Sequence, residues 1–296
     1  MTHILREKAQ EIEILLEQSL PPSATPPSII HEAMRYALLG GGKRLRAIMA
    51  VAACESVGGD PQKAGGVAAA IEMIHAYSLV HDDLPSMDDD DLRRGKPTVH
   101  RMYGEATAIL AGDALLTEAF AELARMPEKY SVDYQTTTEV IREIAAAAGS
   151  QGMVGGQTVD ILAERGQVSA DVDNLRYIHA NKTGALFKAA LRCGGLIGGA
   201  SEKELDALTR FGEHFGLAFQ ITDDILDIVG SEDALGKAIG KDQEKGKLTY
   251  PSLFGLEQAR TMAKESADKC LEVLGELPYE SPILRAIALM VVERDH

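Results

Sequence analysis

Two clusters of aspartates in this chain have the residue types and the spacing of a divalent-metal site. One of them, FQITDDILD, places Asp223 and Asp227 four residues apart, so on a helix both carboxylates lie on one face, with Asp224 beside them. Carboxylate oxygens suit Mg²⁺, which commonly joins one or two protein carboxylates to the phosphates of a substrate. For this cluster alone, an exposed acidic stretch of helix or the N-cap of a following helix is the alternative.

The other cluster, HDDLPSMDDDDLRRG, holds six aspartates within ten residues. Asp82 and Asp88 would lie on different faces of a straight helix. Pro85 disfavours helix in the residue before it, so the chain can turn and bring both carboxylates to one metal ion. Arg93 and Arg94 follow directly, and guanidinium groups bind phosphate oxygens through paired hydrogen bonds. A solvated acidic loop is the alternative for this cluster alone.

Basic residues elsewhere could neutralise a diphosphate. The segment GGGKRLR (40–46) combines three cations with glycines that allow close backbone approach, but it lacks the spacing of a nucleotide-binding P-loop. A helix end explains its glycines equally well. The segment LGKAIGKDQEKGKLTYP (235–251) carries four lysines between glycines, and a solvated loop is its alternative. His75 and Lys182 are further candidates, against the alternatives of a core histidine and an exposed lysine.

Helical periodicity dominates the elements that must hold these residues, and strand signals are nearly absent. Proline, glycine and N-cap residues set the expected helix ends, and a capping box at Ser201 and Glu204 should begin the helix with the second cluster. The sequence therefore predicts an all-α protein with a single domain over residues 1–296. The expected helices span residues 3–19, 27–39, 43–57, 61–83, 105–125, 136–149, 150–165, 171–197 (as one or two helices) and 201–229, with irregular chain at 84–98, a loop at 230–249 and two or three shorter helices after it.

Composition excludes several classes of protein. The 296 residues are 45% hydrophobic and carry a net charge of −15, a globular balance that does not suit a nucleic-acid surface. The cysteines, Cys54, Cys193 and Cys270, lie far apart and fit reduced thiols in a cytosolic protein. The N-terminal residues lack the apolar core of a signal peptide, and no stretch is long and apolar enough to span a membrane. We therefore expect a soluble, cytoplasmic protein.

The motifs, taken together and in order, resemble those of the trans-polyprenyl diphosphate synthase family, most closely the bacterial farnesyl diphosphate synthases. The matching motifs cover roughly residues 36–255 and are GGGKRLR, LVHDDLPSMDDDDLRRGKPTVH, AILAGDALL, MVGGQTVD, HANKTGALF, FQITDDILD and GKDQEKGKLTYP. The resemblance implies the isoprenoid synthase fold, an orthogonal bundle of about 10–13 helices around a central cavity. It also implies a homodimer.

The resemblance further implies a role for each matching residue. Mg²⁺, at about three ions per site and with Mn²⁺ as a substitute, would be bound by Asp82, Asp88, Asp223 and Asp227. The same catalytic group would include Asp83, Asp224, Lys182 and Lys237. Isopentenyl diphosphate would be bound by Lys43, Arg46, His75 and Arg94. The allylic diphosphate would be bound by Arg93, Lys182, Thr183, Gln220, Lys237 and Lys247.

The implied activity is that of a prenyltransferase in isoprenoid biosynthesis. Metal ions and cations would stabilise the departing allylic diphosphate, and the isopentenyl double bond would attack the carbocation in a pocket that excludes water. The expected enzyme is a farnesyl diphosphate synthase (geranyltranstransferase, EC 2.5.1.10) that also accepts dimethylallyl diphosphate. The alternatives are a geranylgeranyl diphosphate synthase with a C20 product, a terpene cyclase, which needs no isopentenyl site, and a regulatory subunit, whose aspartate motifs should be damaged.

Product length is predicted from the helix before Asp82. Tyr77 lies five residues earlier, about 7.5 Å along a helix. In the family an aromatic residue at this position goes with a C15 product, so Tyr77 is expected to form the floor of the pocket. The small Ser78 beside it leaves some room. Ordinary core packing is the alternative for Tyr77.

Overall fold

Helices that are apolar on one or more faces build nearly all of the structure. The computed structural model describes residues 2–229 and 248–293 of the chain. The chain is 76% helical, with almost no strands in the part described. The prediction of an all-α fold is therefore confirmed.

The elements follow one another in a chain of long helices joined by short ones. The α-helices are α1 (His3–Ser19), α2 (Ser28–Leu38), α3 (Leu45–Ser56), α4 (Gly65–Asp82), α5 (Val99–Tyr103), α6 (Glu105–Ala124), α7 (Met126–Tyr130), α8 (Tyr134–Ala148), α9 (Met153–Glu164), α10 (Val172–Ile178), α11 (Ala185–Gly198), α12 (Glu202–Val229), α15 (Tyr250–Phe254), α16 (Leu256–Leu274) and α17 (Pro282–Glu293). A 3₁₀-helix, η1 (Pro61–Ala64), precedes α4, and a π-helix, η2 (His179–Gly184), joins α10 to α11. Strands β1 (Leu92–Arg93) and β2 (Lys96–Pro97) form a short antiparallel hairpin.

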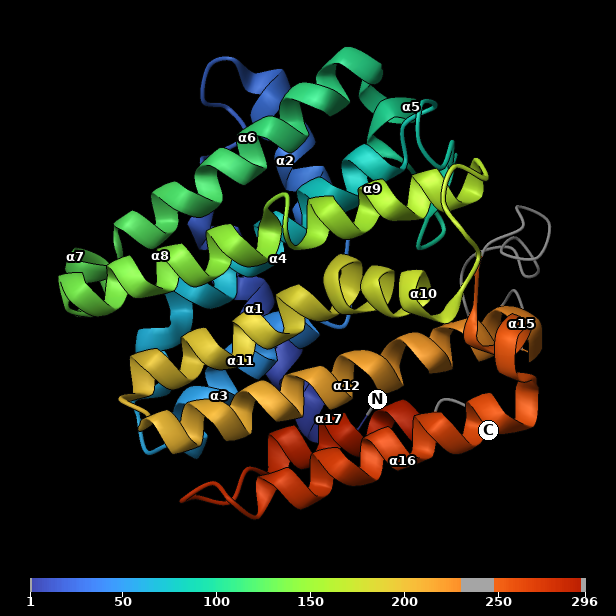
Figure 1. Cartoon of the computed structure of the whole chain (residues 1–296). Helices are drawn as coiled ribbons and strands as arrows, with labels where there is room; N and C mark the ends of the chain where they lie inside the picture. Colours follow the sequence, from blue (N-terminus) through green and yellow to red (C-terminus); the bar gives the residue numbers. More distant parts are fainter. Residues whose placement is uncertain (1, 230–247, 294–296) are drawn as a thin grey trace.

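Helix α4 lies in the core because it is apolar on almost every side. Its residues from Gly65 to Ile74 are all buried. The single charged residue among them, Glu72, pairs at 3.4 Å with the buried Arg44, which precedes α3. A helix without a polar face is stable only when other elements surround it. Figure 1 shows α8, α11, α12 and α16 stacked across the front of the molecule, with α4 and α1 behind them.

Two close helix contacts depend on glycine. A Cβ atom on Gly194 of α11 would lie 2.0 Å from the carbonyl oxygen of Ala50 in α3. A Cβ atom on Gly156 of α9 would lie 2.2 Å from the backbone nitrogen of Lys182 in the π-helix. Any larger residue at these positions would force the backbones apart. The second contact holds α9 directly against the π-helix.

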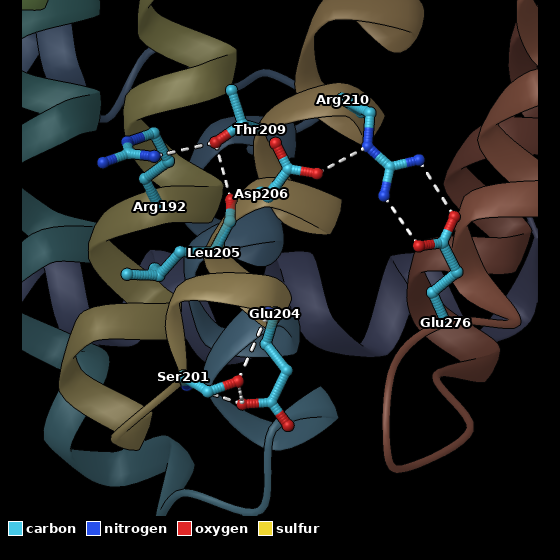
Figure 2. Close-up of polar contacts among 8 residues, drawn as sticks. All are labelled: Arg192, Ser201, Glu204, Leu205, Asp206, Thr209, Arg210 and Glu276. Atoms are coloured by element: carbon cyan, nitrogen blue, oxygen red, sulfur yellow. Dashed lines mark hydrogen bonds and ion pairs between the residues drawn. The ribbon is translucent and has the colours of Figure 1, made fainter.

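Polar contacts fix the first half of α12 against its neighbours (Figure 2). Ser201 and Glu204 form the predicted capping box: the Glu204 carboxylate accepts from the Ser201 amide at 2.6 Å, and the Ser201 hydroxyl accepts from the Glu204 amide at 3.4 Å. Arg210 donates two hydrogen bonds of 2.9 and 2.7 Å to Glu276, which follows α16. These contacts begin the helix at Ser201 and link its first half to the end of α16.

Sequence and structure differ most around residues 84–104 and 171–197. The first segment, predicted as irregular up to residue 98, contains the β1–β2 hairpin and then α5. The second divides into α10, the π-helix and α11. The described residues contain fifteen α-helices, more than the expected bundle of about 10–13. The difference arises because α5, α7 and α15, of five residues each, join longer helices.

Three further predictions concern the cysteines, membrane-spanning helices and the number of domains. Cys54, Cys193 and Cys270 are free and buried. No helix within residues 2–229 and 248–293 has the length and apolar character needed to cross a membrane. The single domain over residues 1–296 stays a prediction.

We expect Gly194→Ala to lower the free energy of unfolding by about 1–3 kcal/mol, because the added methyl group would overlap the Ala50 carbonyl and push α11 away from α3. Urea denaturation followed by circular dichroism measures the change. Gly275→Ala is the control, since its Cβ would lie 3.3 Å from the nearest atom, the Glu272 carbonyl oxygen. The control should change stability by less than about 0.5 kcal/mol. Equal effects of the two substitutions would contradict this packing argument.

Candidate active site

The first aspartate cluster lies where α4 ends. The helix ends at Asp82, and Asp83 is its C-cap. After Pro85 the chain folds back, so that the Asp88 amide donates to the Asp82 carbonyl at 2.8 Å and the Asp90 amide donates to the Asp83 carbonyl at 3.2 Å. The turn predicted from Pro85 is therefore present, and it brings the backbone of Asp88 beside that of Asp82.

Asp82 lies in a crowded and largely buried setting. Its carboxylate accepts a 2.9 Å hydrogen bond from the side-chain amide of Gln157 in α9. Burial is the main reason that the pKa of Asp82 is raised to about 6, with Lys182 lowering it and Asp88 raising it. A nearby cation would stabilise the charged form. The surroundings of Asp82 therefore favour the binding of an additional cation beside its carboxylate.

Asp83 is paired with an arginine. Its side chain is buried, and Oδ1 accepts from Arg93 Nε at 2.8 Å and lies 2.6 Å from Arg93 Nη2. The β-hairpin presents Arg93 together with Arg94, whose backbone has the left-handed φ of 53°. Asp83 therefore anchors the hairpin to the end of α4.

A small cavity of about 60 Å³ lies between the hairpin and α4, and cations dominate its charged lining. The side chains around it include His75, Arg93, Arg94 and Arg44, with Glu72 as a counter-charge. Burial lowers the pKa of His75 well below its usual value, and the surrounding guanidinium groups lower it further, so the imidazole is neutral. The cavity has the charge to bind an anionic group.

The GGGKRLR segment lines this cavity with Gly40 and Arg44, and it contacts Arg94 through Gly42. This residue has a φ of +139°, and a Cβ atom on it would lie 2.7 Å from Nη1 of Arg94. Glycine therefore lets the Arg94 guanidinium lie directly on the backbone of the segment. Lys43, the next residue, is exposed. Arg44 turns inward instead, donating to Glu13 at 2.8 Å and pairing with Glu72.

Arg46 lies apart from the cationic cavity and lines a larger one. Its guanidinium stacks on the Phe187 ring at 4.2 Å, and Nε has no hydrogen-bond partner among the described residues. Burial lowers the pKa of Arg46 to about 10, and the charges of Glu72 and Asp223 oppose that shift. Arg46 is therefore a buried cation within electrostatic reach of the second aspartate cluster.

The π-helix carries two predicted residues that face different neighbours. Lys182 donates to Asp160 of α9 at 2.6 Å and acts electrostatically on Asp82. Thr183 donates to the side-chain carbonyl of Gln220 in α12 at 3.0 Å. Gln220 precedes the aspartate pair that begins at Asp223 by three residues. The π-helix therefore contacts both α9, whose Gln157 binds Asp82, and the turn of α12 that precedes the second cluster.

The second cluster lies near the end of α12, with its three carboxylates in different surroundings. Asp223 is half-buried, whereas Asp224 and Asp227 are each 4% exposed. Asp224 accepts from Gln220 Nε2 at 3.0 Å and from the backbone amide of Tyr250 at 2.9 Å. Within the described part of the chain, no three histidine, cysteine, aspartate or glutamate side chains form a ready-made metal cluster.

The larger cavity, of about 310 Å³, lies beside Asp82 and is lined by both charged or polar side chains and apolar ones. Lys182, Thr183 and Arg46 line it together with Asp82, and the apolar residues include Leu79, Met87, Met153, Val154 and Ile161. Tyr77 and Ser78, the predicted chain-length residues, also border it. The cavity thus joins charged residues to a space suited to a hydrocarbon chain.

Most predicted residues gather around these two cavities, and some important partners were missed. Lys237 and Lys247 lie outside the described residues, so their predicted roles stay predictions. Sequence reasoning did not identify Gln157 and Asp160, the partners of Asp82 and Lys182. Both lie in the motif MVGGQTVD, three residues apart, and this helical spacing was the available signal. The buried Arg44–Glu72 pair gave no comparable signal.

Comparisons with known proteins agree on one family. A family model for polyprenyl synthetases matches residues 27–279. A geranylgeranyl diphosphate synthase of Cyanophora paradoxa is 42% identical over 99% of this chain and 96% of its own length. A heterodimeric geranylgeranyl pyrophosphate synthase large subunit of Arabidopsis thaliana, named chloroplastic, is 46% identical over 90% of this chain and 71% of its own. The apo crystal structure of an FPP/GFPP synthase from Zymomonas mobilis is 40% identical, with a TM-score of 0.86 over 98% of this chain and 97% of that one.

These comparisons contradict the expected farnesyl diphosphate synthase activity, EC 2.5.1.10. Curated relatives that match most of the chain are consistently named geranylgeranyl or geranylfarnesyl diphosphate synthases. The prediction was wrong because it depended on one aromatic residue. Tyr77 is only 7% exposed and packs edge-on against His81, with ring centroids 5.7 Å apart. The cavity also borders Ser78 and His81, so its shape does not follow from Tyr77 alone.

We expect Asp82→Asn to stabilise the metal-free protein at pH 8 by on the order of 1 kcal/mol. The pKa of Asp82 is raised from 3.8 to about 6, so its ionised form destabilises the fold above pH 6, and asparagine removes that charge while it can still accept from Gln157. The gain should shrink as the pH falls through 6 toward 4. Urea denaturation in chelator at pH 8 and pH 5 measures it, with the exposed Asp113→Asn as control. An Asp82→Asn variant that is less stable than the wild type at pH 8 would contradict the raised pKa of Asp82.

Proposed function

The chain belongs to the polyprenyl synthetase family, and from that premise we propose that it condenses isopentenyl diphosphate with allylic diphosphates to give geranylgeranyl diphosphate and inorganic diphosphate. The observation that supports the proposal is that two consecutive residues of the π-helix interact with the surroundings of the two aspartate clusters. Lys182 acts on Asp82 of the first cluster, and Thr183 donates to Gln220 beside the second. A diphosphate bound there would have carboxylate-held metal ions on two sides and a lysine on a third.

Members of the family use Mg²⁺ through their DDxxD motifs. The residues of this chain fit that ion, because Mg²⁺ needs only one or two carboxylates when substrate phosphates and water complete its shell. The raised pKa of Asp82 fits as well, since a bound cation would favour the charged carboxylate. We propose Asp82, Asp88, Asp223 and Asp227 as its ligands. When bound, Mg²⁺ would neutralise charge that develops on the departing diphosphate.

The two cavities suit the two substrates. The small cavity between the hairpin and α4 would bind the diphosphate of isopentenyl diphosphate through Arg94, with the neutral His75 as a hydrogen-bonding neighbour. The exposed Lys43 directly precedes Arg44, which lines this cavity. The larger cavity would hold the allylic chain, with Lys182 and Thr183 at its charged end. His75 and Leu79 line both cavities, so the two substrates would lie on adjacent sides of α4.

The side chains of this arrangement would promote carbon–carbon bond formation in three ways. Lys182 would stabilise the negative charge of the leaving diphosphate. The apolar residues of the larger cavity, such as Met87 and Ile161, would keep water from the allylic cation. Arg94 would hold the isopentenyl double bond within reach of that cation. The released diphosphate would then accept the proton lost from the new prenyl chain.

A C20 product is proposed on two grounds. Relatives that match nearly the whole chain carry the name geranylgeranyl diphosphate synthase. The cavity of about 310 Å³ borders Ser78 and His81 in addition to Tyr77, which leaves room beside the aromatic ring. Tyr77 and Ser78 are therefore proposed as part of the wall that limits product length.

A homodimer is proposed as the assembly. Helix α6 exposes Ile109 and Leu110 at 45% and 55%, and α9 exposes Val154 at 45%. Contiguous apolar patches commonly mark protein–protein contacts, and these side chains are proposed as part of such a patch. The Arabidopsis relative is named the large subunit of a heterodimer. A single polyprenyl synthase domain and a cytoplasmic location also remain proposals for this chain.

The proposal is tested by incubating the protein with dimethylallyl and isopentenyl diphosphates, with Mg²⁺ or with a chelator, and identifying the products by chromatography and mass spectrometry. A C20 diphosphate that forms only with Mg²⁺ is expected. Absence of any metal-dependent prenyl product would contradict the proposed reaction. A different dominant chain length would contradict the C20 assignment while leaving the reaction intact.

We expect Tyr77→Ala to lengthen the products, because removing the ring opens the wall of the larger cavity. Tyr77→Phe is the matched control and should leave the products close to wild type, since it keeps the ring. Mass spectrometry of products under equal turnover measures the shift. If Tyr77→Ala gives the wild-type distribution, then Tyr77 only packs the core and does not limit length.

A further inference from the structure

The middle aspartate of the second cluster uses both of its carboxylate oxygens within the fold. Asp224 is 4% exposed. Its Oδ1 accepts from Gln220 Nε2 at 3.0 Å, one helical turn earlier, and its Oδ2 accepts from the Tyr250 amide at 2.9 Å. A buried carboxylate that accepts hydrogen bonds on both oxygens is firmly oriented. Its geometry differs from that of a carboxylate that faces an open cavity.

These contacts determine the direction of the neighbouring hydrogen bonds. Gln220 turns its amide nitrogen toward Asp224, whose Oδ1 accepts from it at 3.0 Å. The amide oxygen of Gln220 then faces Thr183, and the Thr183 hydroxyl must donate its single proton to that oxygen, at 3.0 Å. With its proton used, Thr183 presents only lone pairs to the larger cavity that it lines.

The same network ties down both ends of the π-helix. Near its C-terminal end, Thr183 is bonded to Gln220, and a Cβ atom on Gly216 of α12 would lie 3.0 Å from Cα of Gly184. At its N-terminal end, His179 packs against the Tyr250 ring, with centroids 5.3 Å apart. Tyr250 is 1% exposed, and its backbone is the group that Asp224 binds. Asp224 therefore connects α12, α15 and the π-helix.

We propose that Asp224 and Gln220 are positioning residues, which fix the π-helix so that Lys182 and Thr183 face the reaction site, and that neither binds metal or diphosphate directly. This inference rests on the function proposed above and departs from the roles that family resemblance implied for both residues. It also assigns the chemistry of Thr183, which accepts hydrogen bonds. Its partner is a donor, such as a water molecule on a bound cation, and not an unprotonated phosphate oxygen.

Hydrogen exchange tests the proposal without any assay of activity. In the full-length protein, Asp224→Ala should speed exchange of the Tyr250 amide by about tenfold or more, because the amide loses its hydrogen-bond acceptor. Asp224→Asn should retain most of the protection, since Oδ1 of asparagine can accept from the same amide. Asp223→Asn is the matched control on the adjacent residue and should leave the Tyr250 amide unchanged. Unchanged exchange in Asp224→Ala would overturn the proposal.

Kinetics then separate positioning from metal binding. Both Asp224 variants and Gln220→Leu should lower kcat, with the asparagine variant less affected than the alanine variant, while the Mg²⁺ concentration for half-maximal activity stays within about twofold of wild type. Asp223→Asn should raise that Mg²⁺ concentration. If Asp224→Asn raises it as much as Asp223→Asn does, Asp224 is a ligand and the proposal fails. If the wild-type protein makes no prenyl product, the proposed function fails, and the exchange result still decides the structural role of Asp224.

Discussion

The constraint on which this structure depends is the burial of like charges at the ends of two apolar helices. Carboxylates in an apolar setting are stable only when cations, hydrogen-bond donors or protons compensate them. Arg93 donates to Asp83, and Lys182 donates to Asp160. Asp224 accepts from Gln220 and from the Tyr250 amide. Asp82 accepts from Gln157, but burial still raises its pKa to about 6. The fold therefore leaves the charge of the Asp82 carboxylate incompletely compensated beside the larger cavity.

The π-helix joins parts of the chain that are distant in sequence at this site. A π-helix has a wider turn than an α-helix, and such turns are frequent at functional sites. Here it directs Lys182 toward α9 and Thr183 toward α12, although the two are consecutive residues. Gly156 permits the close approach of α9 from one side, and Gly216 permits that of α12 from the other. The geometry of the site is therefore set by backbone packing as much as by charged side chains.

Local patterns in the sequence predicted the helices and the chemistry well, and long-range contacts poorly. The amphipathic stretch before Pro21 predicted α1 with the ends that the structure has, and the Ser201–Glu204 pair and Pro85 predicted a capping box and a turn that are present. The two-residue strands of the hairpin are too short to leave a periodic signal. The π-helix differs from an α-helix in hydrogen-bond register, which residue types do not reveal. The contact of Gln157 with Asp82 joins residues 75 positions apart. The prediction of product length was wrong for a related reason. The shape of a cavity depends on several helices, and Tyr77 is only one part of its wall.

The central claim is that both aspartate clusters bind one metal–diphosphate unit between them. Calorimetry with a non-reactive allylic thiolodiphosphate measures this directly, in wild type and in Asp82→Asn and Asp223→Asn variants, each with and without Mg²⁺. The account predicts that tight binding requires Mg²⁺ and that either substitution alone weakens it at least tenfold, because each cluster supplies part of one shared site. Binding that is independent of Mg²⁺, or that survives the loss of one cluster unchanged, would contradict the account.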